Sequence, residues 1–404
     1  MNQVISTARQ AMGWASARRD ARARRAPRLQ GTAAAKPASV YYLCPDVDVP
    51  TGGIRTIYRH VDALNSLGIR AAVVHGRSGF SCSWFEHDTN VTDARSARLG
   101  QADVLVLPEF YSSAIAELPD EPHLVMFNQN TYQTFAGRRP ITERAPRWDT
   151  ERITAVMVVS RDNEDYMRYA FPRLRVERVR NVVDSQVFHP GPAPHGRRIA
   201  VMPRRRAADC RQVLDLLSVR GCLGTWDVVS IDGRSERVTA DLLRSSSVFL
   251  SFSELEGFGM PPAEAMACGC YVVGFTGLAG REYFDPAICT PVEEGNVLAF
   301  AKAVEQTLAA FDADGRGMRE RALAGSANIR TEYSADAQRG DLRAFFGSLT
   351  NDFRDMVRAL SAADGEEGSV EGRHQLLLIA MRPSRRRAEC LGLPSMWMPA
   401  NRAA

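Results

Sequence analysis

Short apolar runs alternate with amphipathic stretches along the first half of the chain. Residues 40–44 form an uninterrupted apolar run, which predicts a buried strand. Apolar residues then recur at spacings of three and four over residues 54–67, which predicts a helix with one buried face, and residues 69–74 predict the next strand. This order indicates a parallel sheet with a right-handed crossover. Three further strands and a helix are expected at residues 103–107, 124–127, 155–159 and 162–170.

The same alternation starts again after a cluster of turn-forming residues between Asp184 and Arg198. This cluster contains three prolines and two glycines, so the sequence places a domain boundary there. The strands expected beyond it are residues 199–202, 226–231, 248–252 and 271–275. The helices expected are residues 209–219, residues 235–244, a segment that begins near residue 297, and a last amphipathic helix over residues 341–362.

These patterns predict an α/β protein with two doubly wound domains. The expected divisions are a flexible Arg/Ala-rich extension (1–37), a first domain (38–190), a second domain (191–340), a C-terminal helix (341–362) and a disordered tail (363–404). Ligands of open α/β sheets bind outside the carboxyl ends of the strands. We therefore expect a cleft between the two domains, lined by the loops that follow those strand ends.

The most informative stretch is residues 253–270. It begins as an acidic, Gly-rich loop and becomes a short helix that starts at Pro261-Pro262. The unpaired N–H groups and the positive dipole end of such a helix make a seat for phosphate. Glu256 and Glu264 flank this seat. Because carboxylates repel phosphate, we expect both to accept hydrogen bonds from hydroxyl groups, and phosphate together with hydroxyls indicates a sugar nucleotide.

Composition narrows the class of protein. The chain has 404 residues, 45% of them hydrophobic and 24% charged, with a formal net charge of +4 at pH 7, which indicates no nucleic-acid or membrane partner. The eight cysteines are scattered without the spacing of a zinc site, so we expect free thiols in a reducing cytoplasm. We expect neither a membrane span, which needs roughly 18 consecutive apolar residues, nor a secretory signal.

The charge is unevenly distributed, because residues 9–28 are rich in arginine and poor in acidic residues. Three interpretations of this segment stay open. It could be a disordered or loosely helical extension, a basic helix that lies peripherally on an anionic membrane, or a nucleic-acid contact. The membrane contact would suit an enzyme whose acceptor is a lipid.

Several segments resemble the signature of glycosyltransferase family 4, whose members are retaining enzymes of the GT-B fold. Residues 253–269 carry a two-carboxylate motif with seven residues between Glu256 and Glu264. The resemblance runs from about residue 39 to residue 360 and includes Thr51-Gly-Gly-Ile-Arg55, Asn181-Val-Val-Asp184, Phe188-His-Pro190 and Val201-Met-Pro-Arg-Arg-Arg206. It implies two Rossmann-like domains that face a cleft, with a C-terminal helix that returns toward the first domain.

The resemblance also assigns roles to residues of the second domain. Glu264 would accept hydrogen bonds from the ribose hydroxyls of the donor. Glu256 would hold the donor sugar together with three backbone groups, those of Gly257, Phe258 and Gly259. The amide of Met260 and the start of its helix would meet the diphosphate.

Further roles fall on glycines of the first domain and on arginines of the second. Gly52 and Gly53 would let the backbone approach the diphosphate closely, because a Cβ there would block it. Arg204, with Arg205 or Arg206, would neutralise the leaving nucleoside diphosphate. No DxD-type metal site follows a predicted strand, so the expected reaction uses neither a metal nor another cofactor.

Three positions depart from the family's pattern. Asp209 stands where the family usually has a lysine, and Val182 stands where glycine is common. Many members carry a histidine after a strand of the first domain to contact the donor sugar. Asn128 and Gln129 occupy that stretch here, so one of them is expected to make this contact. Glu282, near the same edge as the two-carboxylate motif, is a further candidate.

The resemblance implies transfer of a hexose or pentose from a nucleoside-diphosphate donor to a hydroxyl acceptor, with retention, in the cytoplasm or at the inner membrane face. The acceptor would be a surface polysaccharide, another glycan or a glycolipid, contacted by the loops at residues 77–90 and 132–148. Two other hypotheses stay open. The Arg-rich start favours an enzyme that glycosylates nucleic acid, for example a modified base, and Asp209 favours a partner protein that keeps the fold without turnover.

Overall fold

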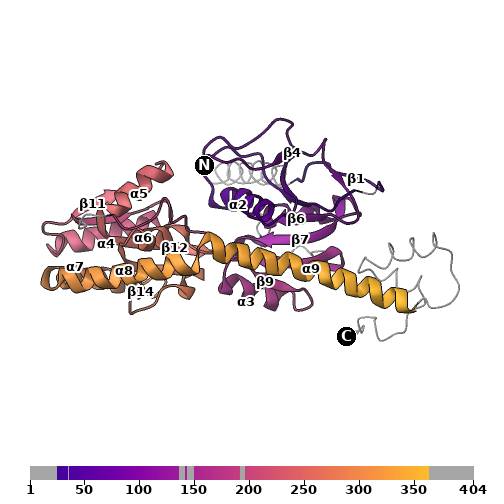
Figure 1. Ribbon diagram of the computed structural model, residues 1–404. Helices are drawn as coiled ribbons and strands as arrows, with labels where there is room; N and C mark the ends of the chain where they lie inside the picture. The colour runs from indigo at the N-terminus through magenta and orange to yellow at the C-terminus, as the bar shows by residue number, and fades with distance from the viewer. Residues whose placement is uncertain (1–24, 35, 136–141, 143–149, 192–195, 364–404) are drawn as a thin grey trace, which may run out of the picture.

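The computed structural model describes residues 25–34, 36–135, 142, 150–191 and 196–363 (Figure 1). Its two parallel sheets lie in the two halves of the chain, and helices pack on both. The first sheet ends with strand β9 at Arg178 and the second begins with strand β10 at Gly196. The chain then returns to the first domain through the long helix α9 (Ala335–Ala363), which Figure 1 draws across both domains.

The first sheet has seven parallel strands. Their spatial order is β4 (Val91–Asp93), β3 (Ala71–His75), β2 (Val40–Leu43), β6 (Val104–Pro108), β7 (His123–Asn128), β8 (Ile153–Val158) and β9 (Val176–Arg178). Tyr42 and Phe127 face the core under helix α2 (Gly52–Ser66), whereas Leu43 and Met126 face the core under the 3-10 helix η1 (Glu109–Glu117) and helix α3 (Arg161–Ala170). Burial of both faces explains why these strands read as continuous apolar runs.

The second sheet has five parallel strands. Their spatial order is β11 (Asp227–Ser230), β10 (Gly196–Val201), β12 (Ser246–Glu256), β13 (Tyr271–Leu278) and β14 (Thr290–Val292). Helices α4 (Ala207–Val219) and α7 (Val297–Ala313) share the core on one face. Helices α5 (Glu236–Arg244) and α6 (Met260–Ala267) belong to the core on the other face, with α8 (Gly315–Glu332) packed against α6. The two predicted doubly wound domains are therefore present.

Helix α9 packs along α2 of the first domain, as predicted. Its buried residues Leu342, Phe345, Phe346 and Leu349 belong to the same core cluster as α2. The helix begins six residues before the predicted start at residue 341. The sequence did not predict this earlier start because the first six residues carry no apolar stripe. The hydroxyl of Ser334, just before the helix, accepts a hydrogen bond from the N–H of Ala337 at 3.2 Å.

Part of the segment expected to be a flexible extension lies on the first domain instead. Strand β1 (Gln30–Gly31) pairs in parallel with β5 (Arg98–Leu99), and Leu29 is buried beside it. A single apolar residue in an Arg/Ala-rich stretch carries no periodicity, so the sequence could not indicate this contact. Residues 1–24, which include most of the basic segment, and the predicted tail from residue 364 onward lie outside the described residues.

Other differences concern short strands and one helix. Strands β4, β5, β9 and β14 have two or three residues each, too few for a recognisable pattern. Helix α8 was not predicted because much of its buried face is small or polar, including Ala322, Gly325 and Ser326. Within the ranges that the structure describes, no helix combines the length and apolarity required to cross a bilayer.

Candidate active site

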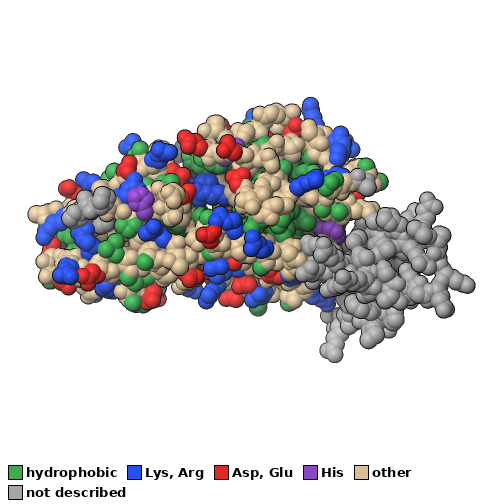
Figure 2. Space-filling model, viewed as in Figure 1, with side chains coloured by type: hydrophobic (Ala, Val, Ile, Leu, Met, Phe, Trp, Pro, Cys, Tyr) green, Lys and Arg blue, Asp and Glu red, His purple; other side chains and the backbone are tan. Residues whose placement is uncertain are grey.

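Two helices from different domains begin at the cleft. Helix α2 starts at Gly52, and helix α6 starts at Met260, just beyond the end of β12. The Nη2 of Arg55, in the first turn of α2, donates to Oε1 of Glu264 in α6 across 3.2 Å. Figure 2 shows a hollow between the two domains with basic side chains in it. The positive ends of both helix dipoles therefore border one space, which favours an anion.

Glu264 is the acid at the centre of a network of charges that crosses the cleft. It is only 8% exposed, and burial raises the pKa of its carboxyl above the ordinary value although the Arg55 charge lowers it. Arg55 also donates to Glu236 at the start of α5. Arg59 continues the network, with ion pairs to Glu236 at 3.8 Å and to Asp184 at 3.1 Å. Glu264 could be identified from the sequence, whereas Arg55 and Glu236 could not, because their partners are far away along the chain.

Glu256 ends β12 beside the arginines of the loop after β10. Its Oε1 lies 2.8 Å from Nε of Arg205. Burial raises the pKa of Glu256, whereas the charges of Arg205 and Arg204 lower it. Both arginines are exposed, so they sit on the open side of the acid. The two predicted acids and these two arginines therefore share the carboxyl edge of the second sheet.

Arg206 is held differently from its two neighbours. Its guanidinium contacts Asp209 at 3.2 Å and Glu294 at 3.3 Å, and it lies over the ring of Phe275 at 4.9 Å. Its backbone has a φ of 46°, at the cap of helix α4. The guanidinium of Arg206 therefore makes contacts that fix the loop, and its contact with the donor stays a prediction. Asp209, which stands where the family usually has a lysine, is one of its partners.

The two amide candidates of the first domain point in opposite directions. Asn128 is fully buried, and its Nδ2 donates to Thr134 Oγ1 at 2.6 Å inside the domain, so it does not reach the cleft. Gln129, one position on, faces the other side, and its Nε2 donates to the carbonyl oxygen of Gly53 at 3.1 Å. Side chains alternate across a strand, so only one of two neighbours can face the site.

The loop that contains Gly257 touches the backbone of the first domain. A Cβ added at Gly257 would lie 1.7 Å from the carbonyl oxygen of Gln129, so only glycine fits this approach. Beside it, Nδ2 of Asn130 donates to the carbonyl oxygen of Leu255 at 3.0 Å. The two domains are therefore closed against each other at this edge.

Backbone strain gathers at the same place. Among the described residues, the non-glycine positions with positive φ are Arg206 (46°), Leu255 (46°) and Leu278 (69°). They follow or end strands β10, β12 and β13, at the carboxyl edge of the second sheet. Such conformations cost about 1–3 kcal/mol each and concentrate at functional sites. The distribution of strain thus marks the same edge as the charges do.

Glu282, the further candidate at this edge, has its contacts in the other domain. Its carboxylate accepts from the backbone N–H of Arg161 at 2.8 Å and lies 3.3 Å from Arg178 Nη1. The side chain is 4% exposed. Glu282 therefore joins the two domains beside the predicted donor site, a role that the sequence did not reveal.

The family comparison covers part of the second domain. A family model described as "Glycosyl transferases group 1" matches residues 207–310. The matched segment runs from the start of α4 into α7 and includes both predicted acids. A curated relative, an alpha-1,6-glucosyltransferase of Actinobacillus pleuropneumoniae serotype 7, is 26% identical over 282 residues, which cover 65% of this chain and 81% of that protein.

Solved structures resemble the whole two-domain arrangement. Sucrose-phosphate synthase from Thermosynechococcus elongatus has a TM-score of 0.56 at 14% identity and covers 78% of this chain and 100% of that one. A glycosyltransferase from Rickettsia africae (TM-score 0.55, 13% identity) covers 78% and 98%. Anabaena HepE, solved with UDP and glucose, gives 0.55 at 12% identity and covers 77% and 99%. These similarities confirm the predicted GT-B fold, and together with the family match they support a glycosyltransferase.

Proposed function

We propose that the protein moves a hexose from a nucleoside-diphosphate donor to a hydroxyl group of a glycan or glycolipid, with retention at the anomeric carbon and without a metal ion. One observation carries the proposal. Arg55 in the first turn of α2 and Glu264 in the second turn of α6 join the two helices near their starts, and Glu256 ends β12 at the same edge of the second sheet. This arrangement offers helix dipoles for phosphate and carboxylates for hydroxyls within one site.

The diphosphate would lie between the two helix starts. The amide of Met260 and the backbone at Gly52 and Gly53 would donate to its oxygens, and Arg204 and Arg205 would neutralise the leaving group. Pro261 and Pro262 follow Met260 and lack N–H groups, so at these first positions only the amide of Met260 and the helix dipole would meet the phosphate. Positive charge placed where negative charge develops is the usual main source of catalysis of this kind.

The two acids would take different parts of the donor. Arg55 holds Oε1 of Glu264, so the carboxylate is oriented and Oε2 can accept from the ribose hydroxyls. Glu256 would accept from hydroxyls of the sugar, after exchanging its contact with Arg205 for the donor. The departing phosphate would take the proton of the acceptor hydroxyl on the same face of the sugar, which gives retention. This reaction differs from glycoside hydrolysis, where two carboxylates straddle the bond.

Glucose attached to UDP is the first donor to test. The curated relative is named for glucosyl transfer, and Anabaena HepE has also been solved with UDP-glucose, with a TM-score of 0.53. Surface polysaccharide or glycolipid synthesis in the cytoplasm, or at the inner membrane face, is the proposed setting. Membership of glycosyltransferase family 4 is part of the same proposal and rests on the motif around Glu256 and Glu264.

The test is a screen of UDP-, GDP-, ADP- and dTDP-hexoses, in which release of the nucleoside diphosphate is measured with and without simple glycoside acceptors. We expect release with one donor, unchanged activity in EDTA, and loss of activity in Glu256→Gln with an unaltered melting profile at low pH. Activity that disappears in EDTA would contradict the metal-free mechanism. An active Glu256→Gln variant would contradict the site assignment, and no release from any donor would contradict the proposed function itself.

A further inference from the structure

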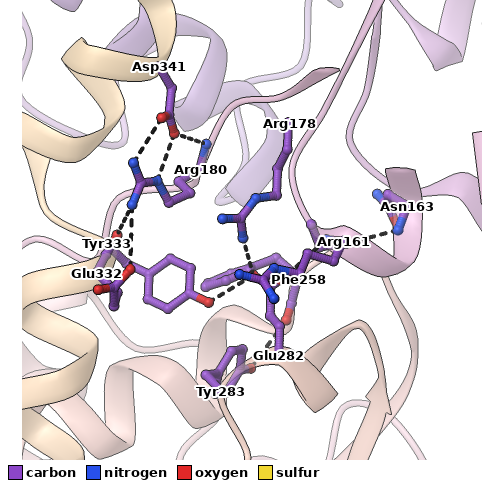
Figure 3. Close-up of polar contacts among 11 residues, drawn as sticks. Arg161, Asn163, Arg178, Arg180, Phe258, Glu282, Tyr283, Glu332, Tyr333 and Asp341 are labelled. Atoms are coloured by element: carbon purple, nitrogen blue, oxygen red, sulfur yellow. Dashed lines mark hydrogen bonds and ion pairs between the residues drawn. The ribbon is translucent and has the colours of Figure 1, made fainter. Parts of the chain in front are cut away.

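A cluster of polar contacts around the buried side chain of Glu282 joins the domains next to the predicted donor site (Figure 3). Glu282 is its central residue and ends the 3-10 helix η4 (Ala279–Glu282) of the second domain. Its Oε2 accepts from the N–H of Arg161, the first residue of α3, and its Oε1 faces Arg178 of β9. Both partners belong to the first domain. The carboxylate therefore accepts a hydrogen bond from the first N–H of α3 and pairs with the Arg178 guanidinium only while the domains are closed.

The next residue along the chain holds the loop that would bind the donor sugar, residues 257–259, which we call the donor loop. The hydroxyl of Tyr283 donates to the carbonyl oxygen of Gly259 at 2.6 Å and lies 3.2 Å from that of Phe258. Gly259 has a φ of 86°, and a Cβ there would lie 2.8 Å from the Tyr283 hydroxyl. Glu282 thus contacts the first domain and Tyr283 contacts the donor loop of the second, and one peptide bond joins these two residues.

Tyr333 makes a second connection between the same two parts. Its hydroxyl donates to Oε1 of Glu282 at 2.8 Å, and its ring lies 4.8 Å from that of Phe258. Phe258 in turn lies 5.2 Å from the ring of Tyr283. Burial raises the pKa of both tyrosines, so both hydroxyls keep their protons and act as donors. The donor loop is therefore held from two sides. Tyr283, the neighbour of Glu282 along the chain, binds its carbonyl oxygens, and Tyr333, whose hydroxyl binds Glu282, packs its ring against Phe258.

We propose that Glu282 is a positioning residue that couples closure of the two domains to the conformation of the donor loop. This inference rests on the proposed function. When the domains separate, the carboxylate loses Arg161 and Arg178, and a charge that was buried and paired must be hydrated again. Tyr333 then loses the fixed position of its hydrogen-bond partner, and Tyr283 loses the fixed position of its neighbour along the chain. Closure and an ordered donor loop therefore stabilise each other.

Glu282→Gln is the informative variant, because it keeps the shape of the side chain and removes the charge. Hydrogen bonds to charged groups contribute about 1.5–3 kcal/mol, so we expect kcat/KM for the donor to fall roughly 10- to 100-fold. Without nucleotide, small-angle scattering should show a more open molecule than the wild type, and saturating UDP should close it again. Hydrogen exchange of a peptide that contains residues 257–259 should be faster in the variant.

Asp341→Asn is the matched control. Asp341 forms a half-buried pair with Arg180, 2.8 Å from Nε to Oδ2, in the same region of Figure 3 without contacting the donor loop. We expect it to lower the melting temperature and to leave exchange of residues 257–259 and kcat/KM unchanged. Tyr283→Phe should raise KM for the donor and open the molecule less than Glu282→Gln does, because it keeps the contacts of Glu282 with Arg161 and Arg178 and weakens closure only through the loop.

The proposal is overturned if Glu282→Gln keeps the closed scattering profile and the wild-type exchange rate of the donor loop. It is also overturned if Asp341→Asn produces the same changes, because Glu282 would then act only as one of many interface contacts. Scattering and exchange need no turnover. A wild-type enzyme that transfers no sugar would therefore contradict the proposed function while the coupling is still decided by these two measurements.

Discussion

Replacement of Gly257 by alanine should separate the function of the closed cleft from the stability of the domains. The new Cβ would lie 1.7 Å from the carbonyl oxygen of Gln129, 2.7 Å from its carbonyl carbon and 3.0 Å from Cα of Asn130. All three are backbone atoms, so no side-chain rotation can relieve the overlap. The two domains must move apart by about 1.3 Å at this point before the first contact reaches 3.0 Å.

That displacement widens the space between the domains in which the donor is expected to bind. A misplacement of about 1 Å in an active site can cost about 100-fold in rate, so kcat/KM for the donor should fall by at least this factor. The overlap lies in a loop where the domains touch and not in either sheet, so circular dichroism should stay native. Gly347→Ala is the control, because a Cβ there meets nothing within 4 Å in helix α9, and alanine favours helix. Wild-type turnover by Gly257→Ala would refute the closed cleft as the active state.

The other predictions concern the charges of the site. Arg55→Met should lower both the melting temperature and the donor kcat/KM, because it leaves Glu264 buried without its partner, a change that typically costs about 3–5 kcal/mol. Arg316→Met, which removes an exposed ion pair with Glu320, should change neither; equal effects of the two variants would contradict the role given to Arg55. Glu256→Gln should abolish sugar transfer, as judged by chromatography of the products. Burial raises the pKa of Glu256 above 4.5, so its contribution to the free energy of unfolding is largest at low pH and is lost as pH rises through the folded-state pKa. The melting temperature of Glu256→Gln relative to wild type should therefore increase from about pH 4 to about pH 7, and a decrease would mean that Arg205 outweighs burial.

The sequence predicted what depends on local pattern. Strand β2 and helix α2 were recognisable because apolar residues recur with the period of each element, and both are buried on the expected side. The loop and helix around Glu256 and Glu264 were recognisable because glycine, proline and acid stand in a fixed order. These are properties that a short stretch carries by itself.

The contacts between domains could not be predicted in this way. Arg55 meets Glu264 from a position 209 residues away along the chain, and Glu282 meets Arg161 across 121 residues. The orientation of Asn128 depended on which face of β7 it occupies, and the ion pair of Arg206 with Glu294 joins two residues that the sequence did not connect. Each of these depends on how two sheets are placed relative to each other.

Proton NMR of the reaction in progress tests the central claim most directly. The donor hexose carries one anomeric configuration, and the coupling of the anomeric proton reports the configuration of the first product before any mutarotation. If the donor lies between α2 and α6 and the acceptor attacks from the face that the phosphate leaves, the first product has the configuration of the donor. A first product of opposite configuration would contradict the proposed mechanism.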